Sequence, residues 1–318
     1  MSASKSFEDR SRAELRCLVA SAVGNLVIAM VGLTVSFLSR SQAILLDGLF
    51  NLIYFATALF TLKVARLVLK GDDERFPYGY AFFEPLVNGL KGVLVLGVSL
   101  MALFGAAQAL IAGGREISPG LALAYGIFAT IAGWVLALLT FRGARRSESP
   151  LVRADADNWV VNAAVSACVL LAFGAIFVIR DTKLAWLVPY VDPLIVLLVV
   201  LVSLAVPLKM VWRALMELLN RRPAGEVVDR VTEIVRTGTA ELPVEALYVR
   251  VIRPGRTLMV GAHVVLPAEF GVERLSALDK VRRDTLARLA EAHPGTILDL
   301  FFTTDAEWGK PTTVTPAI

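Results

Sequence analysis

Charged residues, cysteine and histidine are all scarce in this chain of 318 residues. Charged side chains make up only 19% of the residues, against the roughly 25% of an average soluble protein, whereas 56% are hydrophobic. So much apolar surface needs a solvent other than water, and a lipid bilayer provides one. The two cysteines, Cys17 and Cys168, both lie in apolar helical stretches. They are predicted to be small core residues, which excludes a disulfide and a thiolate metal site.

Signatures of several other protein classes are also missing. The net charge of +4 is not gathered into a basic patch of the kind that binds nucleic acid. The apolar run after the polar N-terminal residues is too long for the core of a cleavable signal peptide. Because no nucleotide-binding loop or catalytic triad occurs, we expect a protein that is not an enzyme. Any transport would then draw its energy from an ion gradient.

Six apolar runs are each long enough to cross a bilayer, which takes roughly 20 residues. They cover residues 17–38, 43–69, 84–113, 119–141, 158–179 and 187–216. Basic residues are concentrated before the first run and after the second, fourth and sixth runs, whereas the other loops hold few. The positive-inside rule therefore places both termini in the cytoplasm. We predict a multi-pass protein of the cell (inner) membrane, in contact with membrane lipid.

After the sixth run, two periodicities alternate. Helical patterns at 227–235 and 275–289 are interleaved with strand patterns at 246–252, 258–266 and 297–302. The order α-β-β-α-β is typical of a small ferredoxin-like α/β domain. Such a domain buries little core, so we expect it to pair with a second copy in a homodimer. The predicted organisation is a cytoplasmic N-terminal segment (1–16), a transmembrane domain (17–222), a cytoplasmic dimerisation domain (223–310) and a tail (311–318).

An ordered set of motifs resembles one family over nearly the whole chain. The segments concerned are 41–49, 76–79, 83–86, 153–156, 192–193 and 301–305. Together they resemble the cation diffusion facilitator (cation efflux) family. The resemblance implies a homodimer that expels divalent metals from the cytoplasm, usually in exchange for protons, with no resident cofactor. It also implies four Asp or His ligands, as i,i+4 pairs on the second and fifth helices, because that spacing puts both ligands of a pair on one helical face.

The ligand positions implied by the resemblance carry other residue types here. They fall on Phe50 and Tyr54 in the second helix and on Asn158 and Asn162 in the fifth. The histidine usual in the second loop is replaced by Tyr80. Of the metal ligands usual in the C-terminal domain, His263 matches one. Asp279 and Asp305 could match or replace others, and Thr303 occupies a third position.

Polar side chains nevertheless remain inside the apolar runs, about one helical turn away. Asp47 and Asn51 form an i,i+4 pair, whereas Asp155, Asn158 and Asn162 share one face of another helix. Ionisable groups this deep in a bilayer are costly and usually face a cavity or one another. We therefore predict a shifted cation site formed by these five residues. The alternatives are structural: the aspartates at helix starts, and the asparagines joining helices by hydrogen bonds.

Two functional hypotheses follow. The first is a secondary transporter that exports a cation through the shifted site. Its oxygen ligands suit manganese, magnesium or iron(II) better than zinc. The second is a non-transporting structural or regulatory partner of an active efflux transporter, motivated by the missing ligands. Lys91 is predicted to be the partner of a buried aspartate, Asp47 or Asp155, and the acidic loop residues 72–74 are either a solvated turn or a weak metal site.

Overall fold

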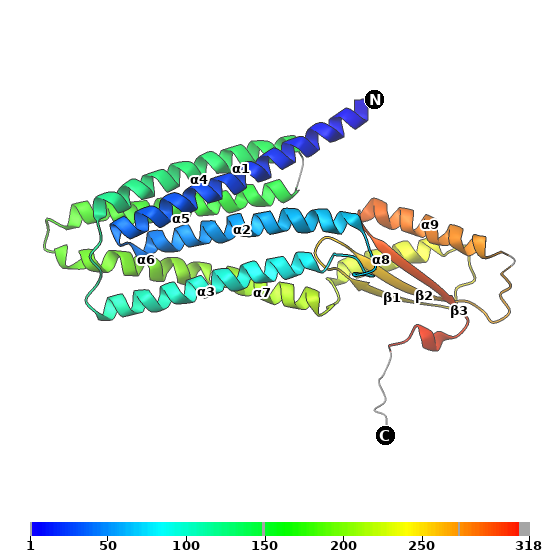
Figure 1. Ribbon diagram of the computed structural model, residues 1–318. Helices are drawn as coiled ribbons and strands as arrows, with labels where there is room; N and C mark the ends of the chain where they lie inside the picture. The colour runs from blue at the N-terminus through cyan, green and yellow to red at the C-terminus, as the bar shows by residue number, and fades with distance from the viewer. Residues whose placement is uncertain (1, 148–149, 273, 312–318) are drawn as a thin grey trace, which may run out of the picture. The chain divides into compact units, whose positions relative to one another are not determined.

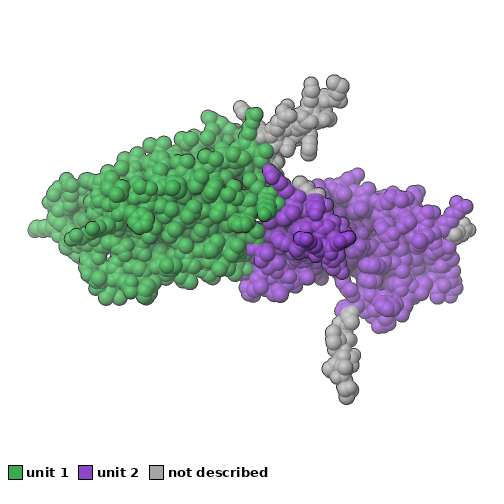
Figure 2. All heavy atoms as spheres, in the orientation of Figure 1, with its two compact units in different colours: residues 1–63, 87–211 green, residues 64–86, 212–318 purple. Residues whose placement is uncertain are grey.

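The chain forms two compact units (Figures 1 and 2). The first consists of the residues up to Lys63 together with Val87–Val211, and the second of Val64–Leu86 together with the residues from Trp212 onward. The computed structural model describes residues 2–147, 150–272 and 274–311. The predicted tail, 311–318, lies outside the described residues except for its first residue.

The first five membrane-spanning segments are single helices, and the sixth is made of three short ones. The helices are α1 (Ser2–Ser39), α2 (Gln42–Lys70), α3 (Phe83–Ile111), α4 (Pro119–Ser147), α5 (Pro150–Ile179), η1 (Ala185–Leu187), α6 (Val188–Ser203) and α7 (Ala205–Leu218). Within the described residues, six segments are long and apolar enough to cross a membrane. The predicted six spans are thereby confirmed, and the chain is a multi-pass membrane protein.

Two details of these helices differ from the prediction. The sixth span is interrupted between α6 and α7, because Pro207 has no N–H to donate to the carbonyl of the preceding turn. Cys168 is exposed on α5 and is therefore not the core residue that was predicted. A helix that crosses a bilayer keeps apolar side chains on its outer surface, so apolar surroundings in the sequence do not identify the core.

Small residues let α4 and α5 pack closely along their length. A Cβ atom added at Gly126 would lie 3.2 Å from Cα of Leu170, and one added at Gly133 would lie 3.1 Å from Cβ of Ala163. The two contacts are seven residues apart on both helices, which is two helical turns. Close backbone approach through small residues is the usual way in which helices associate in lipid.

A buried aspartate of α6 caps the N-terminus of α2. Asp192 is fully buried and accepts hydrogen bonds from the hydroxyl of Ser41 (2.5 Å) and from the backbone N–H groups of Gln42 (3.0 Å) and Ala43 (3.2 Å). The first N–H groups of a helix have no partner within the helix, so this carboxylate satisfies donors that would otherwise be buried unpaired. Asp192 therefore has a structural role in the start of α2.

The second unit contains the predicted α-β-β-α-β domain. Its elements are α8 (Gly225–Gly238), β1 (Ala246–Ile252), β2 (Met259–Val265), α9 (Leu275–Ala292), β3 (Ile297–Thr303) and η2 (Ala306–Trp308). The sheet order is β1-β2-β3, with β1 antiparallel and β3 parallel to β2. Apolar side chains of both helices and one face of the sheet form the core, including Val231, Val235, Leu289 and Leu300. The ferredoxin-like fold class is confirmed.

A candidate cation site in the membrane-spanning helices

Asp47 and Asn51 of α2 are joined directly. The amide nitrogen of Asn51 donates hydrogen bonds to the backbone carbonyl of Asp47 (2.8 Å) and to its Oδ1 (3.3 Å). The hydroxyl of Tyr125, on α4, donates to Oδ2 of Asp47 (2.5 Å). Both carboxylate oxygens therefore have donors. Asn51 is 1% exposed, and within the described part of the chain its Oδ1 has no hydrogen-bond partner. This oxygen is available to a cation.

Two glycines bring Tyr125 within reach of Asp47. A Cβ atom at Gly32 of α1 would lie 2.8 Å from the hydroxyl of Tyr125 and 3.1 Å from Cα of Gly48 on α2. Any larger side chain at Gly32 would displace the hydroxyl or separate the two helices. The polar contact thus depends on a backbone crossing that only small residues permit.

Asp155, at the start of the fifth apolar span, is held by α1. Its carboxylate accepts a hydrogen bond from the hydroxyl of Ser21. The same hydroxyl oxygen accepts a hydrogen bond from Nε1 of the buried Trp159 (2.8 Å). Oδ2 of Asp155 is buried, with no hydrogen-bond partner among the described residues. A second buried oxygen therefore lacks a donor, on a different helix from Asn51.

Lys91 of α3 lies over an aromatic ring. Its ammonium nitrogen is 4.5 Å from the ring centroid of Tyr54, and the negative charge of Asp155 attracts it. In the described structure, Lys91 forms no ion pair within 4.0 Å of Asp47 or Asp155, so its attraction to Asp155 acts over a longer distance than a salt bridge. The reason is that the face of the Tyr54 ring attracts the ammonium through its electron density. Tyr54 stands at a ligand position implied by the family resemblance.

The five predicted site residues are brought together only in part. The α2 pair is in direct contact, and no hydrogen bond joins it to Asp155 in the described structure. Asn158 is exposed and Asn162 is half-buried. The described residues contain no group of three or more His, Cys, Asp or Glu side chains that could hold a metal ion. A site on these helices would therefore use amide as well as carboxylate oxygens, and the set of five stays a prediction.

The acidic loop before α3 has a structural explanation. Asp73 accepts hydrogen bonds from Nζ of Lys70 (2.8 Å), the hydroxyl of Tyr80 (2.7 Å) and the backbone N–H groups of Arg75 and Phe76. These bonds, that of Lys70 above all, hold the pKa of Asp73 well below its usual range. Tyr80, which replaces the histidine implied by the resemblance, closes this turn.

The C-terminal residues that could match family ligands have other partners. His263 stacks on Phe301 with 4.9 Å between ring centroids, and burial, followed by the charge of Arg250, lowers the pKa of the imidazole. Asp279 pairs with Arg282 (2.7 Å). Asp305 accepts a hydrogen bond from the backbone N–H of Glu307 (2.9 Å), and the Thr303 hydroxyl donates to the Asp305 carbonyl (3.2 Å). These four candidates do not gather into one site.

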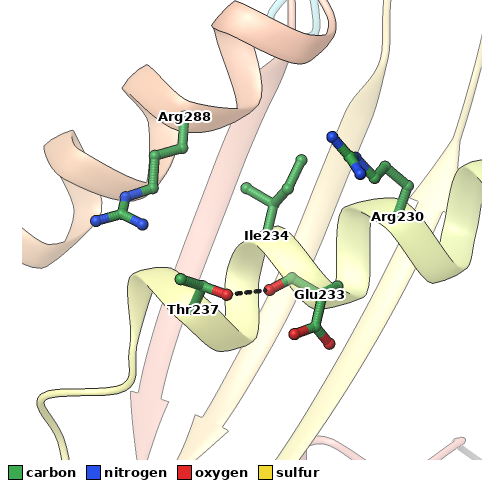
Figure 3. Close-up of a pocket in the computed structure, with 5 residues that line it drawn as sticks. All are labelled: Arg230, Glu233, Ile234, Thr237 and Arg288. Carbon is green, nitrogen blue, oxygen red and sulfur yellow. Dashed lines mark hydrogen bonds between the residues drawn. The ribbon is translucent and has the colours of Figure 1, made fainter.

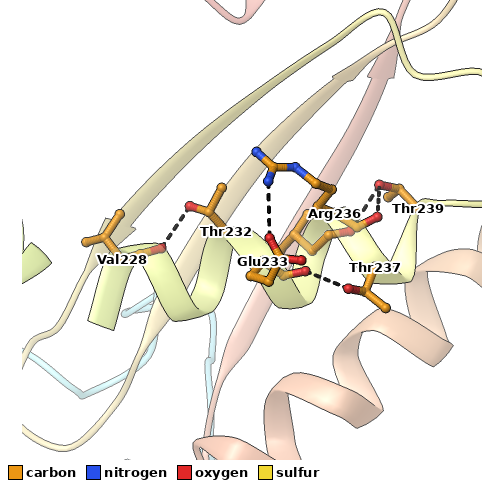
Figure 4. A network of polar contacts seen from close by, with 7 residues as sticks. Val228, Thr232, Glu233, Arg236, Thr237 and Thr239 are labelled. Carbon is orange, nitrogen blue, oxygen red and sulfur yellow. Dashed lines mark hydrogen bonds and ion pairs between the residues drawn. The ribbon is translucent and has the colours of Figure 1, made fainter. Parts of the chain in front are cut away.

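A shallow hollow of about 270 Å³ lies between α8 and α9 (Figure 3). Its lining includes the guanidinium groups of Arg230 and Arg288 and the carboxylate of Glu233. Glu233 is engaged within α8: its carboxylate pairs with Arg236 (3.1 Å) and its backbone carbonyl accepts from Thr237 (2.9 Å) (Figure 4). Because the charge of Glu233 is already paired, the two arginines leave the hollow with a net positive charge that repels a cation. The hollow is therefore not a candidate for the transport site.

Two of the side chains that hold the candidate site were missed by sequence reasoning. Ser21 is an ordinary small residue in an apolar helix, and no pattern marks it. Tyr125 is a single phenol within an apolar span, and a buried phenol usually has a hydrogen-bond partner. The presence of a phenol in an apolar span could therefore have marked Tyr125 as a candidate, but it would not have identified Asp47 as its hydrogen-bond acceptor.

The sequence is similar to a family model and to several transport proteins. The model of the cation efflux transmembrane domain matches residues 18–219. An uncharacterized transporter of Synechocystis is 24% identical over 74% of this chain and 74% of its own length. The manganese efflux system protein MneS of Bacillus subtilis is 27% identical over 48% of this chain and 52% of its own length. The cation-efflux pump FieF of Shigella boydii is 25% identical over 69% and 70%.

Proposed function

Because the chain belongs to the cation efflux family, whose transmembrane domain covers all six spans, we propose that it exports a divalent cation from the cytoplasm. It acts as a transporter and not as an enzyme, and the cation is its cargo and not a resident cofactor.

The observation that carries the proposal is a pair of buried oxygens without donors. Oδ1 of Asn51 and Oδ2 of Asp155 belong to α2 and α5, the two helices that carry the ligands in the family resemblance. Buried polar atoms in native proteins almost always have a partner, and an unpaired one calls for an explanation such as an ion. A cation held by these oxygens and by the charge of Asp47 would supply what they lack. Asn158 and Asn162 complete the proposed ligand set.

The ligand chemistry favours a hard or borderline cation. All five proposed ligands offer oxygen, and none is an imidazole or a thiolate. Carboxylate and amide oxygens suit magnesium, manganese and iron(II) better than zinc. The similarity to a protein named as a manganese efflux system supports manganese as the first ion to test.

Proton exchange is the proposed energy source. The buried carboxylate of Asp155 attracts the ammonium of Lys91, so a cation that binds Asp155 competes with both a proton and this lysine. Such competition lets entry of protons drive release of the cation. We place the protein in the cell membrane with both termini in the cytoplasm, as the loop charges indicate, so that export carries the cation away from the side of the termini. The C-terminal domain would hold two copies together as a homodimer.

One alternative has an observation in its favour. Phe50 packs against the apolar core of the bundle, and the ring of Tyr54 is covered by Lys91. Neither ligand position on α2 thus carries a carboxylate or an imidazole, and the ring at the second position is engaged by an ammonium group. A non-transporting partner of an active efflux transporter would show this pattern.

Flux through purified protein separates the two functions. The full chain is reconstituted into liposomes that contain a metal-sensitive dye, and manganese, magnesium, iron(II), cobalt, zinc and cadmium are added in turn, with and without a pH gradient. The proposal expects protein-dependent uptake of at least one ion. Uptake should be faster when the pH gradient drives protons out of the liposomes, opposite to the movement of the ion. If none of the six ions moves faster than in protein-free liposomes under either condition, the chain is not a transporter of this kind.

A further inference from the structure

An apolar groove runs along the outside of the helix bundle between α1 and α4. Its volume is about 620 Å³, and the two helices lie side by side (Figure 1). Val19, Val23 and Val27 of α1 form one wall and Val135 of α4 belongs to the other. Each of these four side chains is about half exposed. The groove therefore opens outward and not into the bundle.

The floor of this α1–α4 groove is formed where the two helices are closest. The side chain of Leu136 fills the space that a Cβ atom at Gly24 would occupy, and Ile28 beside them is 1% exposed. Gly24, Ile28 and Leu136 all belong to the groove lining. A floor of this kind gives the groove the shape of a channel along the helices, which suits an extended hydrocarbon chain.

One end of the groove is positively charged. Arg16 belongs to the lining, and the α4 backbone at Gly143 lies directly against Cys17, the next residue on α1. The antiparallel helices therefore bring Arg142 of α4, which lies two turns beyond Val135 on the same face, to the level of Arg16. Both arginines are exposed, and neither forms an ion pair within the described structure. Arg145, two residues further along α4 than Gly143, lies instead over the ring of Phe141, 5.5 Å from its centroid. The loop charges place this end at the cytoplasmic surface.

We propose that an anionic phospholipid binds here, with one acyl chain in the α1–α4 groove and its phosphate at Arg16 and Arg142. The occupant follows from the distribution of charge: a long apolar channel that ends in two arginines complements an acyl chain that ends in a phosphate. Arginine is especially suited to phosphate, because its planar guanidinium can donate two parallel hydrogen bonds. A lipid without net charge, such as phosphatidylcholine, would place the ammonium of its choline group beside the arginines and would bind less well.

The test measures the melting temperature of the full chain in detergent. Phosphatidylglycerol, phosphatidylcholine with the same acyl chains, and inorganic phosphate are titrated separately. We expect phosphatidylglycerol to raise the melting temperature at concentrations at which the other two have little effect. The double variant with alanine at Arg16 and Arg142 should need roughly 30-fold more phosphatidylglycerol for the same rise. Arg180→Ala, which removes an exposed arginine in a different loop, is the matched control and should behave as the unmodified chain.

A second variant tests the groove independently of charge. Ala132→Phe fills the channel and should abolish the rise, and Ala20→Leu replaces it if that variant fails to fold. Equal effects of the two lipids would overturn the proposal, and so would an equal effect of inorganic phosphate, which shows a headgroup site without the groove. The same holds if the double variant responds normally, if Arg180→Ala loses as much as the double variant, or if the filled groove still responds.

Discussion

Replacing Lys91 with methionine removes one positive charge from the candidate site and keeps the length of the side chain. The structure shows two consequences for stability that oppose each other. The contact with the ring of Tyr54, at 4.5 Å, contributes about 1–2 kcal/mol when the ammonium is partly desolvated. The variant loses this contribution and avoids the cost of burying an ammonium group. We therefore expect the free energy of unfolding to change by only about 1 kcal/mol.

The effect on cation binding should be larger. No atom of the ammonium lies within 4.0 Å of the Asp155 carboxylate, so their attraction stays below the roughly 4 kcal/mol of two unit charges at 4 Å near a protein surface. When the lysine is removed, a cation no longer competes with it for the carboxylate. The repulsion between the lysine and a bound divalent ion, which is twice that of a monovalent ion, is also lost. Since 1.4 kcal/mol is tenfold, Lys91→Met should lower the half-saturating cation concentration roughly 10- to 100-fold.

Liposome flux and melting temperature, measured on the same preparation, test this expectation. Lys183→Met, which removes an exposed lysine from a loop, is the control and should change neither quantity. If Lys91→Met leaves both the half-saturating concentration and the melting temperature unchanged, the lysine has no part in the site. If it changes the melting temperature alone and no ion is transported by either protein, the non-transporting alternative is supported.

Three further predictions concern the supporting structure. Gly32→Ala should lower the free energy of unfolding by about 1–3 kcal/mol, because its Cβ would overlap with the tyrosine hydroxyl that binds the α2 aspartate; Gly97→Ala, with nothing within 4 Å, should not lower it. Glu84 and Arg256 form an ion pair (2.5 Å) in which the glutamate side chain is only 14% exposed. A double-mutant cycle of thermal unfolding should give a coupling energy of about 1 kcal/mol for this pair, and independent effects of the two single variants would contradict it. Because burial lowers the pKa of His263, the folded state resists its protonation, so melting temperature should fall as the pH drops below about 6.5, and His263→Phe should remove that part of the dependence.

The elements of the fold could be predicted because each depends on a local pattern. A run of apolar residues long enough for a bilayer defines a span whatever its neighbours are, and alternation defined the three strands to within one residue at each end. The interruption of the sixth span was not predicted, although Pro207 lies within the apolar run. An apolar pattern continues through a proline, so hydropathy alone does not reveal where the hydrogen-bond ladder is broken.

The site could be predicted only as far as its residues lie on single helices. The spacing of Asp47 and Asn51 placed them on one face, and the structure joins them. The contact of Asp47 with Tyr125 spans 78 residues of sequence and depends on where two glycines let helices cross. No helical periodicity encodes that crossing. The contact of Lys91 with the ring of Tyr54 was missed for a related reason: charge predicted an aspartate partner, and nothing in the sequence places a ring of α2 under a lysine of α3.

The central claim is that Asp155 binds the transported cation. Its most direct test is the initial rate of manganese uptake into liposomes by the unmodified chain, Asp155→Asn and Asp157→Asn. Asp157 is the matched control, because it is exposed and pairs with Arg153 (3.5 Å) on the same helix. The account predicts that Asp155→Asn, folded by melting temperature, loses uptake while Asp157→Asn retains it. Uptake by Asp155→Asn at the rate of the unmodified chain would contradict the account.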